Sequence, residues 1–167
     1  KFSKKDVLFV DVGANIGLWT LFAASKGFRT MSFEANAMTF RRLSANCVLN
    51  NLQHVTDLRF NAIDEVEGRT VFSMIAPNNM GANRILNESR YGEVAVRTVR
   101  LGDIEALRRH CERNLPLVLK MDIEGFETKA FRGGEWLWQS GCVRAYYVEM
   151  LPTYHSREEV LGISMLL

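Results

Sequence analysis

A glycine-containing turn between a buried strand and a helix constrains the fold of this chain more than any other feature. The run VDVGANIG closes an apolar segment, residues 7–12, and a helix-like segment, residues 18–26, follows it directly. Glycine adopts backbone angles that other residues avoid, so Gly13 and Gly17 permit a sharp turn and the close approach of a ligand. A turn that leads into a helix N-terminus presents free N–H groups, which favour an anionic group.

The rest of the chain alternates short apolar runs with segments of helical period, which predicts a parallel α/β sheet. We therefore expect a single domain over residues 1–167, with a doubly wound, mostly parallel Rossmann-like sheet and helices on both faces. The further predicted strands are residues 29–34, 58–63, 70–75, 93–100, 117–122 and 143–149. The further predicted helices are residues 38–51, 103–113, 126–131 and 156–167. Between two of these strands, the polar stretch 77–92 predicts a long loop, and long loops are often functional.

An acidic residue, Glu34, ends the second predicted strand. There its carboxylate, which we expect to be partly exposed, can accept hydrogen bonds from two ribose hydroxyls. The glycine spacing is G-x-x-x-G, whereas dinucleotide-binding turns have G-x-G-x-x-G. Asp11 precedes the turn, where it would repel a pyrophosphate but attract a cation such as the ammonium group of a methionine moiety. The pattern favours S-adenosylmethionine over NAD or FAD.

Ionisable residues also follow two later strands. The run KMDIEGFE ends the strand at 117–122, and Glu149 ends the next one. Ligands bind at the carboxyl ends of strands in such sheets, so we assign a functional role to Asp122 and Glu124. For Glu127 we favour a structural role in a charge cluster at a helix start. Sequential parallel strands usually pair, which predicts that Asp122 and Glu149 lie side by side.

The combination of VDVGANIG, SFEAN, LKMDIEGFE and a strand ending in YVE resembles the FkbM-type methyltransferase family over residues 7–150. The resemblance implies a Rossmann-like enzyme that transfers a methyl group from S-adenosylmethionine, typically to an oxygen of a small molecule or sugar. It implies that Glu34 binds the ribose, that residues 61–64 flank the adenine, and that Asp122 and Glu124 sit beside the methyl. The cofactor-binding residues it implies are Asp11, Gly13, Ala14, Asn15, Gly17, Glu34, Ala35, Asn61, Ala62 and Asp122. The closing strands that such folds usually carry are expected to be missing from this chain.

An oxygen acceptor must lose its proton, and either Asp122 or Glu124 could serve as the general base. Three alternatives stay open on sequence grounds. Asp122 and Glu149 could share a Mg²⁺ ion, a cation that prefers oxygen ligands, although we favour a site without metal. The chain could bind the cofactor without catalysis, or it could be an NAD-dependent oxidoreductase.

Composition narrows the class of partner. The formal net charge of +2 is too small to favour nucleic acid, and no apolar run approaches the roughly 20 residues that span a bilayer. We expect a small-molecule acceptor such as a sugar or a secondary metabolite. The three cysteines are widely spaced without a CxxC pair, which predicts reduced thiols and a cytoplasmic protein.

Overall fold

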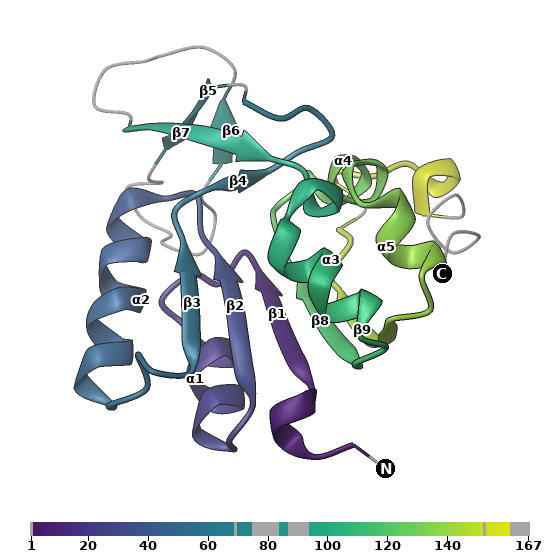
Figure 1. Cartoon of the computed structure of the whole chain (residues 1–167). Coiled ribbons are helices and arrows are strands. Elements are labelled where there is room, and N and C mark those ends of the chain that lie inside the picture. Colours follow the sequence, from purple (N-terminus) through teal and green to yellow (C-terminus); the bar gives the residue numbers. More distant parts are fainter. Residues whose placement is uncertain (1, 69, 75–83, 87–93, 152, 161–167) are drawn as a thin grey trace.

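A five-stranded parallel sheet forms the centre of the protein (Figure 1). The computed structural model describes residues 2–68, 70–74, 84–86, 94–151 and 153–160. The strand order is β3-β2-β1-β8-β9. The strands are β1 (Leu8–Val12), β2 (Arg29–Phe33), β3 (Thr56–Arg59), β8 (Leu117–Met121) and β9 (Val143–Val148). From β1 the chain adds β2 and β3 on one side of the sheet and then β8 and β9 on the other side. The expected Rossmann-like α/β sheet is confirmed.

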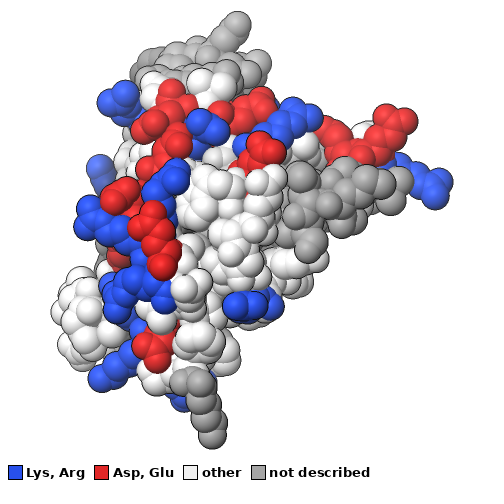
Figure 2. Space-filling view, turned by 45° about the vertical axis from the view of Figure 1, so that its right-hand side comes forward, with Lys and Arg blue, Asp and Glu red and all other residues white. Residues whose placement is uncertain are grey.

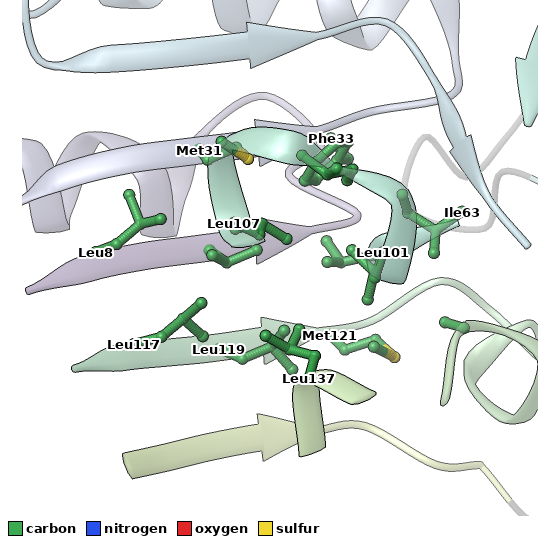
Figure 3. Close-up of a cluster of buried hydrophobic side chains, with 14 of the residues drawn as sticks. Leu8, Met31, Phe33, Ile63, Leu101, Leu107, Leu117, Leu119, Met121 and Leu137 are labelled. Carbon is green, nitrogen blue, oxygen red and sulfur yellow. The ribbon is translucent and has the colours of Figure 1, made fainter. Parts of the chain in front are cut away.

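Helices cover both faces of this sheet. They are α1 (Leu18–Ser25), α2 (Ala37–Leu49), α3 (Glu105–Glu112), α4 (Glu127–Gly133) and α5 (Glu135–Gln139), with short 3₁₀ helices η1 (Lys4–Asp6) and η2 (Leu101–Asp103). Alternate apolar residues of β1, β2 and β8 are buried beneath η2, α3, α4 and α5 (Figure 3). On the other face, Leu43 and Cys47 of α2 pack with Ala14 and with Leu21 of α1. The alternation of burial follows from the period of two in a strand.

A second, smaller sheet lies at the carboxyl edge of the central one (Figure 1). Its order is β4-β7-β5-β6, and β5 runs antiparallel to both of its neighbours. The strands are β4 (Ala62–Ile63), β5 (Thr70–Met74), β6 (Arg84–Leu86) and β7 (Val94–Val99). The prediction of one strand over residues 58–63 is therefore wrong, because β3 and β4 belong to different sheets. The alternation of apolar and polar residues in this segment does not reveal which strand each residue will pair with.

Two other predicted segments fall partly outside the described residues. Strand β6 lies within the expected loop 77–92, and the remainder of that loop is not described. Residues 157–160 are helical, as expected for the start of the last helix, and residues 161–167 are not described.

Charged side chains of both signs are interspersed over the surface that Figure 2 shows, in keeping with the small net charge. Within the described ranges, no helix is both long enough and apolar enough to cross a membrane.

A disulfide joins Cys111 of α3 to Cys142, just before β9. The prediction of three reduced cysteines is therefore wrong for this pair, whereas Cys47 is a free, buried thiol. The two bonded residues are 31 positions apart, and their Cα atoms come within 5.3 Å. Sequence spacing could not show this proximity, because it arises only when α3 packs against the sheet.

Reducing this disulfide should lower the free energy of unfolding by about 3–4 kcal/mol, because the bond restricts the unfolded chain. Urea unfolding with and without dithiothreitol measures the effect. The Cys111→Ser/Cys142→Ser double variant is the control, and dithiothreitol should not change its midpoint. An equal midpoint for the wild-type protein in both buffers would contradict the prediction.

Candidate functional site

The candidate site lies where four strands end at the carboxyl edge of the central sheet. The last residues of β1, β2 and β8 are paired in register, so Gly13, Glu34 and Asp122 follow at neighbouring positions. Strand β9 pairs with β8 in the same way. Glu149 therefore follows beside Asp122, and its amide donates to the carbonyl of Met121 at 2.9 Å. The expected side-by-side placement of these two strand ends is confirmed.

The turn after β1 is tied to the end of β2. The amides of Gly13 and Ala14 both donate to the carbonyl of Phe33, at 3.0 and 2.9 Å. Three residues of the turn have positive φ angles: Gly13 at +81°, Asn15 at +51° and Gly17 at +99°. Glycine takes such angles freely and asparagine tolerates them better than most residues, which explains the composition of the turn.

Atoms of the protein fill the space beside the two glycines, where a Cβ atom would lie. A Cβ atom on Gly13 would overlap the carbonyl oxygen of Asp122, and one on Gly17 would lie 2.5 Å from a methyl carbon of Leu43. The sequence analysis explained both glycines by the approach of a ligand. In the structure, Gly13 allows the β1 turn to touch the β8 turn, and Gly17 allows α1 to pack against α2.

Glu34 is held between the two loops that flank it. Its Oε2 accepts the Asn15 amide at 2.7 Å, and its Oε1 accepts the Asn36 amide at 2.6 Å. The residue is only 7% exposed, so the expectation of a partly exposed carboxylate is wrong. Burial raises its pKa, and the two amide hydrogen bonds and a hydrogen bond from the Thr39 hydroxyl oppose that shift. A carboxylate can accept about four hydrogen bonds, so the Glu34 oxygens keep capacity for a further one.

Asn36 is a site candidate that the sequence analysis missed. Its Oδ1 accepts the amides of Met38 and Thr39, at 2.9 and 3.2 Å, and so caps α2. Its Nδ2 is buried and has no acceptor among the described residues. An asparagine directly before a helix-period segment is a cap signal, and that pattern could have identified it.

A buried polar network lies beneath the β1 turn. The Thr20 hydroxyl donates to Asp11 Oδ2 at 2.7 Å. The ammonium group of Lys120 lies 3.4 Å from Asp11 Oδ1, donates to the Gly13 carbonyl at 2.7 Å, and is 3.8 Å from Asp122 Oδ2. Lys120 therefore links the turn after β1 to the acidic turn after β8.

Asp11 is a buried carboxylate with a cation of the same chain beside it. Its side chain is 0% exposed, and the Lys120 ammonium group lies 3.4 Å from its Oδ1. Burial raises its pKa, and Lys120 and the Thr20 hydroxyl oppose the shift. Asp11 thus supports the turn from below.

The turn after β8 carries the two predicted catalytic acids. The Asp122 amide donates to the Val12 carbonyl at 3.0 Å, and the Asp122 side chain is about one-third exposed, at 36%. Glu124 has a φ angle of +52°, which is uncommon for a residue with a side chain. Burial raises the pKa of Glu124, and the nearby carboxylates of Asp122, Glu127 and Glu149 raise it further.

The residues expected beside the adenine lie in and around β4, the first strand of the second sheet. Ala62, at 2% exposure, forms a small cluster with Val96 of the second sheet, and Ala35 and Phe60 pack against it. Asn61 is partly exposed, and its Nδ2 donates to a carbonyl of β7 at 3.2 Å. The structure thus brings Ala35 and Ala62 together beside Glu34.

A cavity of about 240 Å³ is lined by residues of β1, β8, β9 and α1. Aromatic residues including Phe9, Trp19 and Tyr147 line it, together with Lys120. Within the described part of the chain, no group of three histidine, cysteine or acidic side chains is arranged to hold a metal ion.

The parallel sheet, with helices on both faces and the strand order β3-β2-β1-β8-β9, defines a Rossmann-like α/β fold. The family model described as the Methyltransferase FkbM domain matches residues 11–166, and the chain therefore belongs to this family. No curated protein and no solved structure matches the chain.

Replacing Glu34 tests the site and the fold together. Glu34→Ala should lower the free energy of unfolding by about 2–4 kcal/mol, because two backbone N–H groups lose their acceptor, each costing about 1–3 kcal/mol. Chemical unfolding measures the change. Glu34→Gln keeps one acceptor oxygen and should lose about half as much; equal stability of the alanine variant and the wild type would contradict the geometry.

Proposed function

We propose that the chain is an S-adenosylmethionine-dependent methyltransferase that acts on an oxygen of a small hydroxylated molecule, such as a sugar or a secondary metabolite. The observation that carries the proposal is Glu34. Its carboxylate is fixed by two amides at the tip of β2 and, with the Thr39 hydroxyl as a further donor, retains acceptor capacity for a ribose hydroxyl.

Other features of the same edge suit this cofactor. Helix α1 has no side-chain cap and no acidic residue in its first turn, so its free N–H groups suit a carboxylate such as that of a methionine moiety. The buried Nδ2 of Asn36 offers a donor near Glu34. Ala35, Phe60 and Ala62 supply an apolar surface for an adenine.

The bound cofactor would supply a methyl group already activated by its sulfonium. The protein must then orient the acceptor oxygen and take its proton. Glu124 suits the second task, because its partial burial and the neighbouring carboxylates raise its pKa and make it a stronger base. Asp122, partly exposed and 3.8 Å from Lys120, is the second candidate for contact with the acceptor.

Calorimetry with S-adenosylhomocysteine and with NAD⁺ tests the cofactor assignment. We expect binding of the first only, and binding of NAD⁺ alone would support an oxidoreductase instead. Incubation with methyl-labelled S-adenosylmethionine and a panel of hydroxylated sugars and phenols then tests catalysis. Transfer of the labelled methyl group to a hydroxyl oxygen, which gives a methyl ether, supports the proposal. Transfer only to nitrogen or carbon acceptors would contradict the oxygen assignment.

The role of metal can be decided in the same assay. We expect EDTA to leave methyl transfer unchanged, because the ammonium group of Lys120 already places positive charge near Asp122 and no metal ion is needed there. We expect Asp122→Asn to abolish methyl transfer. Loss of activity in EDTA with recovery in Mg²⁺ would instead establish metal assistance through Asp122 and Glu149.

A further inference from the structure

A buried hydrogen bond links the acidic turn after β8 to the segment that follows β9. His155 Nε2 lies 2.6 Å from Glu127 Oε2, and the side chains of both residues are 1% exposed. The other ring nitrogen, Nδ1, lies 3.3 Å from the Thr128 hydroxyl. Burying a carboxylate costs free energy unless its oxygens accept hydrogen bonds, so the hydrogen-bond partners of Glu127 show what this residue supports.

Glu127 uses its oxygens to hold the turn between Asp122 and Gly125. Its Oε1 accepts the amide of Ile123 at 2.8 Å, and its Oε2 accepts the amide of Gly125 at 3.0 Å. One carboxylate therefore spans the turn that contains Glu124. The two amides lie on either side of the residue whose carboxyl we propose as the base.

The turn needs such support because its backbone is unfavourable. Glu124 has a φ angle of +52° and Gly125 one of +103°. A Cβ atom on Gly125 would lie 3.0 Å from Cβ of Tyr154, the residue before His155. Positive φ at a residue with a side chain costs about 1–2 kcal/mol, so it persists only where the surroundings impose it.

We propose that Glu127 and His155 are positioning residues, which act as a clamp on the 122–125 turn and so orient Asp122 and Glu124 for the reaction. His155 holds Glu127 Oε2, Glu127 holds the amides of Ile123 and Gly125, and those amides fix the backbone of Glu124. The effect on the reaction rests on the proposed function, whereas the clamp itself does not. From the sequence alone, Glu127 was expected to have a structural role only.

Amide hydrogen exchange measured residue by residue by NMR tests the clamp. In His155→Leu, the exchange rates of Ile123 and Gly125 should rise about ten- to a hundredfold, the range for losing a hydrogen bond to a charged group. Amides in the middle of α2 should keep their rates. His155→Gln, whose amide nitrogen can replace Nε2 as a donor, should restore most of the protection.

Two further variants keep the test decisive if His155→Leu fails to fold. Glu127→Gln has one acceptor oxygen in place of two, so one of the two amides should lose protection and the other should keep it. Thr128→Ala is the matched control, because it removes only the 3.3 Å contact on the far side of the ring. Its exchange pattern should equal that of the wild type.

Binding and catalysis are measured on the same variants. His155→Leu should slow methyl transfer about tenfold or more at saturating S-adenosylmethionine, while S-adenosylhomocysteine affinity changes less than threefold, since Glu34 and the β1 turn are untouched. Unchanged exchange at Ile123 and Gly125 would overturn the clamp. Raised exchange with unchanged turnover would overturn only its role in positioning. A wild-type protein that binds no S-adenosylhomocysteine would overturn the proposed function and leave the exchange result valid.

Discussion

Gly13→Ala is expected to lower the free energy of unfolding by more than about 4 kcal/mol, a loss seen only when a specific structural conflict arises. Two causes act together. The φ angle of +81° costs about 1–2 kcal/mol for any residue with a Cβ atom. The new Cβ would also overlap the carbonyl oxygen of Asp122, so the backbone of one turn must move. Because domains are typically stable by about 5–15 kcal/mol, urea unfolding or a thermal melt will detect this loss.

Gly27→Ala is the matched control for the cost of backbone conformation alone. Gly27 has a similar φ angle of +88°, but a Cβ atom there has nothing within 4 Å. The control should lose only about 1–2 kcal/mol. Equal losses at the two positions would mean that Gly13 is required for its backbone angle and not for its contact with Asp122.

Lys120→Met is expected to cost about 3–5 kcal/mol, because it leaves Asp11 buried without a cation. Asp11 is 0% exposed and lies 3.4 Å from the Lys120 ammonium group. The Gly13 carbonyl loses its donor as well. We expect the loss to be smaller in the Lys120→Met/Asp11→Asn double variant, which removes the charge together with its partner. Additive losses in this double-mutant cycle would contradict a direct interaction.

The pH dependence of the Lys120→Met variant follows from the raised pKa of Asp11. Burial raises this pKa above its ordinary value of 3.8, and Lys120 opposes the shift. Without Lys120 the pKa rises further, so the folded state holds a proton that the unfolded state releases as the pH increases. The stability lost in the variant should therefore be larger at pH 7 than at pH 5. Unfolding curves at the two values provide the measurement.

The local features of the site were predictable from the sequence because they arise within a few residues of each other. Gly13 and Gly17 indicated a sharp turn, and both have positive φ angles. The apolar runs indicated parallel strands whose acids, Glu34 and Asp122, would meet at one edge. Both predictions depend on backbone preferences and on the period of burial in strands, which are properties of short segments.

The partners of buried charges were not predictable in the same way. Asp11 lies beside Lys120, 109 positions along the chain, and no local pattern in the sequence indicated this pair. His155 and Glu127 are 28 positions apart and form a buried pair. Such pairs depend on which strand ends and loops come together in the folded protein. The sequence alone does not reveal those contacts.

The amino-acid sequence by itself determined the class of sheet, the position of the glycine turn and the acids at the strand ends, because each follows from local periodicity and backbone angles. The tertiary structure alone decided the second sheet, the Cys111–Cys142 bond and the close contact of Gly13 with the Asp122 backbone. It also decided that Glu34 is buried and Asp122 is partly exposed. These depend on contacts between segments far apart in the chain, and those contacts are selected by the packing of the whole molecule rather than by any one segment.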